Sequence, residues 1–265
     1  MSINDINNAA AAMNQLKARY EGFLDDADGQ ISVRQAAYDA LSANLKGVVS
    51  SEMDRVISVN NTLTERAGTV FPTIKEAVES VPSGAQVVVK LNTGQTHIID
   101  ADVYVSNRRV VFTYAGDLAA GRPKIKPIAS VVGGVNQMFG FTGSNADIQL
   151  STVDIELPDV TPDINLGWNG QRRSLVVSSR AGTRSISLSS CIVTGGVADS
   201  VLGIISVYES AYSALALFVT TFDGPMAGVI DGNGGVFNIR RTSATLLNGA
   251  VLNSGGTLGT HFLQN

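Results

Sequence analysis

The sequence is poor in charged residues, aromatic residues and cysteine. Only 16% of its 265 residues are charged, and Cys191 is the single cysteine. Soluble domains carry about 25% charged residues on average. We therefore expect either partner subunits or a surface rich in Ser, Thr, Asn and Gly in place of the missing charges. One cysteine excludes an intrachain disulfide and a cysteine-based metal site.

The chain also lacks the positive charge that nucleic-acid binding requires. Its net charge is −4, and no lysine follows Lys126. Phosphate binding needs clustered Lys and Arg, so we expect no nucleic acid among the partners. The longest apolar stretches, such as Val201–Tyr208, fall far short of the roughly 20 residues of a membrane span. Met1–Asp5 has neither the basic nor the apolar part of a secretory signal, so we expect a soluble chain made in the cytoplasm, without membrane insertion.

Residues 1–66 have a helical pattern. Apolar residues recur there at spacings of three, four and seven: Ile3, Ile6, Met13, Leu16, Tyr20 and Leu24. The polar run at residues 25–29 is expected to interrupt this helix. Ser32 and Gln35 form a capping box that predicts the start of a second helix. One stripe of the second helix contains Tyr38, Leu41, Leu45, Val49, Met53, Val56, Asn60, Leu63 and Ala67.

From Val49 onward this stripe advances by four and three residues in turn, as in a coiled-coil seam. An amphipathic helix packed on its own domain and a self-associating coiled coil are both compatible with it, and the narrow stripe favours the coiled coil. A polar core residue such as Asn60 fixes register and the number of chains. The predicted oligomerisation residues are Leu45, Val49, Met53, Val56, Asn60 and Leu63.

Residues 67–265 have the pattern of an all-β region. Short β-branched runs alternate there with Gly, Asn, Asp and Ser, and the capping box of Thr73 and Glu76 predicts a short helix over residues 73–81. Four segments share the form apolar-x-apolar, two or three small or polar residues, apolar: 147–155, 185–193, 214–222 and 236–244. Such a loose repeat is typical of stacked coils. A β-sandwich is the alternative, because Asn-Gly and Asp-Gly turn signals also occur.

The stretch Phe71–Val89 resembles the start of right-handed parallel β-helix proteins of the pectate lyase, pectin esterase and phage tailspike families. In those families an amphipathic helix caps the first coil. The resemblance implies a mainly β fold, a right-handed parallel β-helix (solenoid) over residues 67–265. The polar, Ala- and Asn-rich leader resembles the virion-anchoring end of bacteriophage tail fibres and tailspikes. That resemblance implies an N-terminal α-helical coiled-coil stalk over residues 1–66 and a homotrimer.

The sequence has few candidates for catalysis. It contains no Gly-x-Ser-x-Gly elbow, Walker A loop or His-Glu-x-x-His motif, and its two histidines, His97 and His261, are far apart in sequence. Asp154 and Glu156, two apart on a predicted strand, are the candidate acid and base if the protein cleaves glycans. The plainer interpretation of this pair is a solvated strand face. We expect no metal and no cofactor.

Three further residues are candidates for glycan binding: Trp168, Arg172 and Arg173. A tryptophan beside carboxylates can stack on a sugar ring, and the arginines can bind anionic glycans. A buried tryptophan at a coil corner and ion pairs between subunits are the plainer interpretations.

The sequence thus predicts a non-enzymatic structural or receptor-binding component of a phage tail fibre or tailspike. A homotrimeric rod would connect other tail or baseplate proteins of the virion to a further fibre subunit or to the host surface. At the host surface it would contact polysaccharide. The alternative is a polysaccharide-degrading tailspike, a glycoside hydrolase or lyase that acts on host surface glycan. A bacterial surface adhesin is a third hypothesis.

Overall fold

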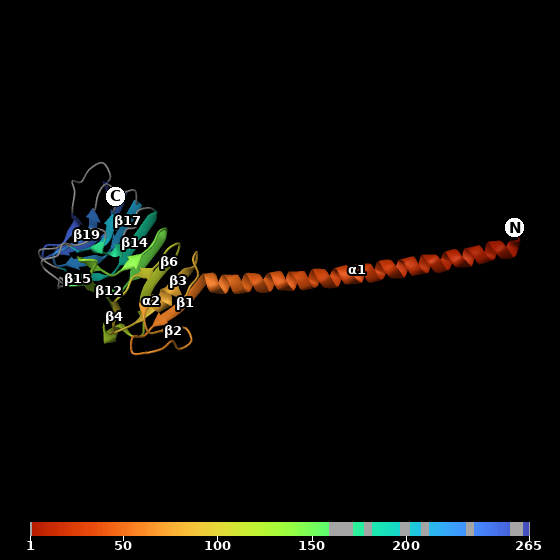
Figure 1. Ribbon diagram of the computed structural model, residues 1–265, viewed down its shortest axis with the longest axis horizontal. Helices are drawn as coiled ribbons and strands as arrows, with labels where there is room; N and C mark the ends of the chain where they lie inside the picture. Colours follow the sequence, from red (N-terminus) through yellow and green to blue (C-terminus); the bar gives the residue numbers. More distant parts are fainter. Residues whose placement is uncertain are drawn as a thin grey trace. The chain divides into compact units, whose positions relative to one another are not determined.

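The computed structural model describes residues 2–158, 172–177, 182–196, 202–207, 212–231, 236–254 and 262–264. The chain divides into two compact units, Met1–Ser51 and Glu52–Asn265 (Figure 1). The boundary predicted between residues 66 and 67 therefore lies too far along the chain. A mainly β fold with one long N-terminal helix is confirmed.

Helix α1 (Ile3–Met53) runs without interruption for 51 residues, so the predicted break at residues 25–29 was wrong. A glycine inside a helix costs only about 1 kcal/mol, and Gly29 is followed by Gln30, which favours helix. The Ser32 hydroxyl donates a hydrogen bond to the Asp28 carbonyl oxygen at 2.9 Å. Ser32 is therefore an interior helix residue and caps no second helix.

Strand β1 (Asp54–Val59) begins where α1 ends, so the prediction of helix up to residue 66 was also wrong. Ile57 and Val59 are buried while Val56 is exposed, as expected from the alternation of a strand. β1 pairs in parallel with β3 over its whole length. A run as short as this is too short for its apolar pattern to distinguish a helix from a strand, and the pairing partner decides between them.

The predicted coiled-coil seam therefore loses its last members. Val56 lies on β1, and Asn60 and Leu63 follow that strand outside any helix. The Asn60 side chain accepts hydrogen bonds from the Thr62 N–H and the Gln95 side-chain amide, so it anchors a turn. Leu45, Val49 and Met53 do lie on α1.

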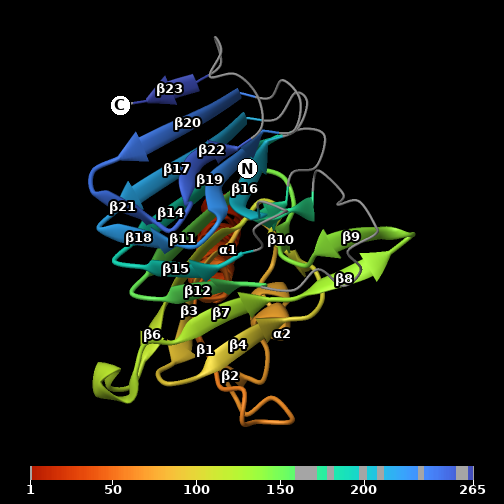
Figure 2. The ribbon, with the colours of Figure 1, turned by 90° about the vertical axis from the view of Figure 1, so that its left-hand side faces the viewer.

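The second unit contains three sheets of parallel strands (Figure 2). The first sheet has the order β2 (Val70–Phe71), β1, β3 (Gln86–Asn92), β6 (Arg109–Ala115), β11 (Ala146–Ser151), β14 (Thr183–Ser189), β17 (Tyr212–Phe218), β20 (Val236–Arg241) and β23 (Phe262–Gln264). The second has β4 (Thr96–Ile99), β7 (Lys124–Pro127), β12 (Asp154–Leu157), β15 (Ile192–Gly195), β18 (Thr220–Asp223) and β21 (Ala244–Leu247). The third has β5 (Val103–Tyr104), β10 (Phe141–Thr142), β13 (Ser174–Val177), β16 (Leu202–Val207), β19 (Met226–Asp231) and β22 (Val251–Ser254).

From β3 onward the chain visits these sheets in a fixed cyclic order, first, second, third and then first again. Within the described residues, two elements interrupt the sequence of strands: the 3-10 helix η1 (Leu118–Ala120), and the antiparallel hairpin of β8 (Ala129–Val132) and β9 (Val135–Met138). Parallel pairing between successive turns of the chain is incompatible with the β-sandwich alternative, whose strands are antiparallel.

The core is made of apolar rows that run across the strands. Ile148 of β11 pairs with Ile186 of β14, which pairs with Leu215 of β17, as the sequence repeat predicts. The last repeat is different, because Leu215 pairs with Ile239 and not with Phe237. Both residues belong to the buried face of β20, so a shift of two keeps the apolar row intact.

Helix α2 (Ile74–Glu79) lies within the range predicted for a helix. The Thr73 hydroxyl accepts a hydrogen bond from the Glu76 N–H at 3.2 Å, as in a capping box. Ile74, Ala77 and Val78 are buried against the first strands of the unit.

Candidate functional site

The two candidate catalytic carboxylates lie side by side on strand β12 of the second sheet. Asp154 and Glu156 point outward, while Ile155 and Leu157 are buried in the core. This follows from the period of two along a strand. Strand β7 lies next to β12 with Lys124 aligned to Asp154, so the register places basic side chains beside both carboxylates.

Glu156 is held between two lysines. Its Oε1 atom is 2.5 Å from Lys126 Nζ, and its Oε2 atom is 3.3 Å from Lys124 Nζ. The hydrogen bond from Lys126 is the main reason that the pKa of Glu156 is lowered, against a smaller opposing effect of burial. A general acid for glycoside cleavage needs the opposite shift, because it must hold its proton near neutral pH.

Asp154 connects neighbouring turns of the chain. Its Oδ1 atom accepts a hydrogen bond from the Ile192 N–H at 2.9 Å and lies 3.4 Å from Arg122 Nη1. The same Arg122 atom donates to the Ser190 carbonyl oxygen at 2.6 Å. These contacts give Asp154 a structural role that joins β12 to β15.

The candidate glycan-binding arginines lie elsewhere. Arg172 Nη1 is 2.6 Å from Asp102 Oδ2, and both side chains are largely buried. Arg173 is half-buried, and within the described part of the chain its Nε atom has no hydrogen-bond partner. Trp168 lies outside the described residues. Among those residues no hydrogen bond or ion pair joins either arginine to Asp154 or Glu156.

Cys191 and His97 are buried in the core of the β unit. Burial raises the pKa of the Cys191 thiol to about 11, so the thiol stays protonated and unreactive near neutral pH. Burial lowers the pKa of His97, whose Nδ1 atom has no partner among the described residues. Within the same residues, no cluster of His, Cys, Asp and Glu could hold a metal ion.

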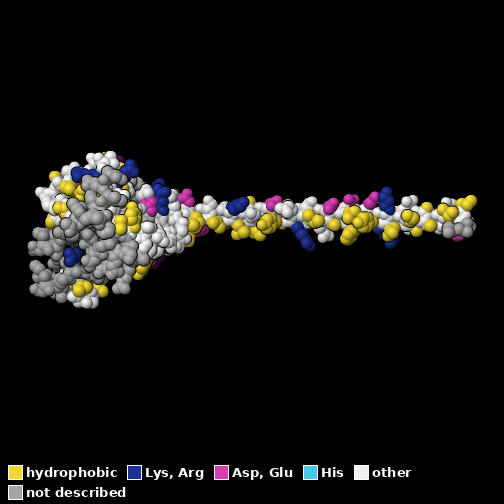
Figure 3. Space-filling view, turned by 90° about the horizontal axis from the view of Figure 1, so that it is seen from above, with side chains coloured by type: hydrophobic (Ala, Val, Ile, Leu, Met, Phe, Trp, Pro, Cys, Tyr) yellow, Lys and Arg dark blue, Asp and Glu magenta, His cyan; other side chains and the backbone are white. Residues whose placement is uncertain are grey.

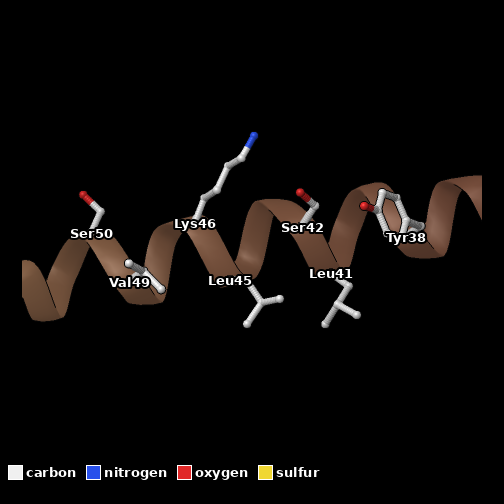
Figure 4. A pocket seen from close by; sticks show the side chains of 7 residues that line it. All are labelled: Tyr38, Leu41, Ser42, Leu45, Lys46, Val49 and Ser50. Atoms are coloured by element: carbon white, nitrogen blue, oxygen red, sulfur yellow. The ribbon is translucent and has the colours of Figure 1, made fainter.

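In the part of the chain that the structure describes, helix α1 carries most of the exposed large apolar side chains. No residue of α1 is buried, and Leu45 and Val49 are more than half exposed. Figure 4 shows Leu41 and Leu45 on the side of the helix away from Ser42, Lys46 and Ser50. In the space-filling view, hydrophobic side chains form a band along one side of α1 (Figure 3).

Because α1 is continuous, its apolar positions keep one heptad register across the expected break. Leu24, Ala27 and Ile31 link the two halves with steps of three and four. The seam, as we name these positions, is apolar except at the charged residues Lys17 and Arg34. It contains Ile3, Ile6, Ala10, Met13, Lys17, Tyr20, Leu24, Ala27, Ile31, Arg34, Tyr38, Leu41, Leu45 and Val48. Sequence reasoning missed it because the Asp- and Gly-containing run was taken as a helix end, and because Val49 was followed in place of Val48.

Of the helices that the structure describes, none combines the length and the hydropathy of a membrane-spanning segment. Because its apolar side chains are exposed along the helix, the seam of α1 is a candidate for contact with other protein. Comparisons of the chain with protein-family models, with curated proteins and with solved structures found no match.

Proposed function

We propose that this protein is a structural, receptor-binding component of a phage tail fibre or tailspike, in which α1 joins three copies as a coiled coil. The observation that carries the proposal is the seam, a mainly apolar stripe on a 51-residue helix that buries none of its residues. Most helical stability in proteins comes from packing an amphipathic face. Burial of apolar surface contributes about 25 cal/mol per Å². Self-association would bury the seam and so supply the packing energy that α1 lacks in a single chain.

The β unit suits the proposed role as a rigid rod. We propose that it is a right-handed parallel β-helix, supported by three parallel sheets that the chain visits in cyclic order. Its strands are bonded to the turn before and the turn after, so few strand edges are free. A rod of this kind, carried in three copies, would present weak glycan sites at high effective concentration. It would link tail or baseplate proteins to the host surface or to a further fibre subunit.

The first test is the solution mass of the full-length chain by light scattering. We expect three times the 27.7 kDa of one chain. Leu41→Asp with Leu45→Asp places charges in the seam and should give a monomer. Ala43→Asp with Ser50→Asp makes matched changes outside the seam and should leave the mass unchanged. A monomeric parent chain, or a seam variant that keeps the mass of the parent, would contradict the proposal.

A second measurement tests the role in attachment. The parent and the seam variant are titrated onto immobilised bacterial surface polysaccharides, and multivalency should make the parent bind at least about a hundredfold more tightly. The length of the polysaccharide is compared before and after contact. Shortening that is lost in Asp154→Asn or Glu156→Gln would favour the polysaccharide-degrading alternative, which the lowered pKa of Glu156 does not support.

A further inference from the structure

The outward face of the first sheet carries a short ladder of valines. Val56 of β1 pairs with Val88 of β3, which pairs with Val111 of β6. Val56 is 56% exposed, and Val88 and Val111 are half-buried. Farther along the sheet the same row continues with Gln149, Ser187 and Ala216. We name Val56, Val88 and Val111 the valine ladder.

The other two sheets offer no comparable apolar row. The outward face of the second sheet carries the ion pairs of Asp154 and Glu156 with Arg122, Lys124 and Lys126. In the third sheet, every residue of β13 and β16 is buried. Among the described strands, the valine ladder is therefore the aligned row of three apolar side chains that solvent can reach, while Tyr212 and Val236 form an exposed pair.

The position of the ladder in the chain indicates what covers it. No residue separates Met53, the last of α1, from Asp54, the first of β1. If α1 joins copies of the chain, as proposed above, the first strands of those copies begin where their helices end. The ladder starts three residues later, at Val56, so a second copy is the partner that the association of α1 brings nearest.

Opposite charges flank the ladder. Asp54 lies in the row on one side and Lys90 in the row on the other, and both are exposed. Four residues along a strand separate these rows, roughly 13 Å. Within the described part of the chain neither residue forms an ion pair. In a rotationally symmetric ring, one edge of the contact face of each copy meets the opposite edge of the same face on the next copy. An acid on one edge and a base on the other therefore attract each other between neighbouring copies.

We propose that the valine ladder is a contact surface between copies of this chain, with Lys90 of one copy next to Asp54 of the following copy. This proposal rests on the proposed function, because it needs α1 to bring the copies together. It adds a second interface, which fixes the β units of the assembly against each other.

Thiol cross-linking of full-length chains tests the proposal. Val111→Cys is the reporter, because Val111 lies two strands from β1, roughly 10 Å away, and chain tethering alone does not bring such positions together. Ile98→Cys is the matched control on β4 of the second sheet, where Ile98 is 45% exposed. Leu41→Cys reports association through α1. The parent chain is the blank, because Cys191 is buried and unreactive.

We expect a short bifunctional thiol reagent to link Val111→Cys chains with a yield several-fold above that of Ile98→Cys chains. If Leu41→Cys chains are linked while Val111→Cys chains give no more product than Ile98→Cys chains, the ladder is no interface, although association through α1 stands. If Leu41→Cys chains are not linked either, the proposed function and this inference both fail.

A charge exchange tests the predicted pairing. In the Val111→Cys chain, Lys90→Glu should lower the cross-linking yield several-fold at low ionic strength, where exposed charges are least screened. Adding Asp54→Lys should restore the yield, since it recreates the pair with the charges exchanged. If Lys90→Glu leaves the cross-linking yield unchanged, or if Asp54→Lys does not restore it, the proposed pairing of these two residues is wrong.

Discussion

Val219 occupies the bend between β17 and β18 with φ 51°. The corresponding bends between the first and second sheets use Thr152 and Ser190, with φ 59° and 54°. A left-handed backbone is costly for every residue except glycine, and asparagine tolerates it better than other residues. Valine is branched at Cβ, so it suits this conformation least. Val219 is also 68% exposed, so little packing offsets its strain.

Replacing Val219 should therefore stabilise the protein. We expect Val219→Asn to raise the free energy of unfolding by about 1 kcal/mol, the order of the left-handed strain that it relieves. Urea unfolding measures the change. Val236→Asn is the control, because Val236 is exposed on strand β20 without a positive φ, and there the substitution should give no gain. Equal effects at the two positions would show that φ is not the cause.

At the scale of elements, the pairing of β7 with β12 forms a charge cluster on the second sheet. One carboxylate, Glu156, lies between two ammonium groups, Lys124 and Lys126. Removing it leaves two like charges facing each other. The side chains are partly exposed, so solvent screens the cluster and its contribution is below about 1 kcal/mol.

The lowered pKa of Glu156 predicts how this contribution depends on pH. Glu156 binds a proton less readily in the folded than in the unfolded state, so its stabilising effect is complete above the ordinary pKa of about 4.5. It is lost as the pH falls through the lower pKa of the folded state. The difference in unfolding free energy between the parent and Glu156→Gln should therefore be constant near neutral pH and shrink in acid.

Urea unfolding at several pH values measures this difference. In a Lys126→Met background, Glu156→Gln should lower the free energy of unfolding by less than in the parent, because Lys126 is the main cause of the pKa shift of Glu156. A parent that keeps its advantage over Glu156→Gln down to the lowest pH would contradict the assignment.

The boundary between helix α1 and strand β1 depends on a pairing partner as well as on the local sequence pattern. Residues 49–59 continue the predicted helical stripe at Val49, Met53 and Val56, and they end in β-branched residues that favour a strand. Helix α1 ends at Met53 and strand β1 begins at Asp54, because Ile57 and Val59 can pair with Val89 and Leu91 of β3 and bury their side chains. The partner strand lies some thirty residues farther along the chain, so local reasoning favoured the helix.

For the whole molecule, association through α1 links helix content to concentration. A helix that is stabilised by other copies loses that support on dilution, as mass action requires. We expect the helical part of the far-ultraviolet circular dichroism of the parent to fall on dilution while the β part stays. The seam variant with Leu41→Asp and Leu45→Asp should show the weak helical signal at every concentration. A parent signal that is independent of concentration down to the monomeric range would contradict this coupling.

The sequence by itself determined the features that depend on local periodicity. Alternation along the strands predicted the all-β second region and the alignment of Ile148 with Ile186 and Leu215. The capping box of Thr73 and Glu76 marked α2. These features follow from side-chain geometry within one segment, which needs no knowledge of the neighbouring segments.

The tertiary structure decided everything that depends on distant partners. It ended α1 at Met53, because β3 supplied a parallel neighbour for β1. It moved the candidate carboxylates into ion pairs, because stacking the turns of the chain placed Lys126 beside Glu156 and Arg122 beside Asp154. It also placed Arg172 in an ion pair with Asp102. These contacts join residues about thirty to seventy positions apart in the sequence. Which residues meet depends on the register between successive turns, and the variable lengths of the loops set that register only in the folded chain.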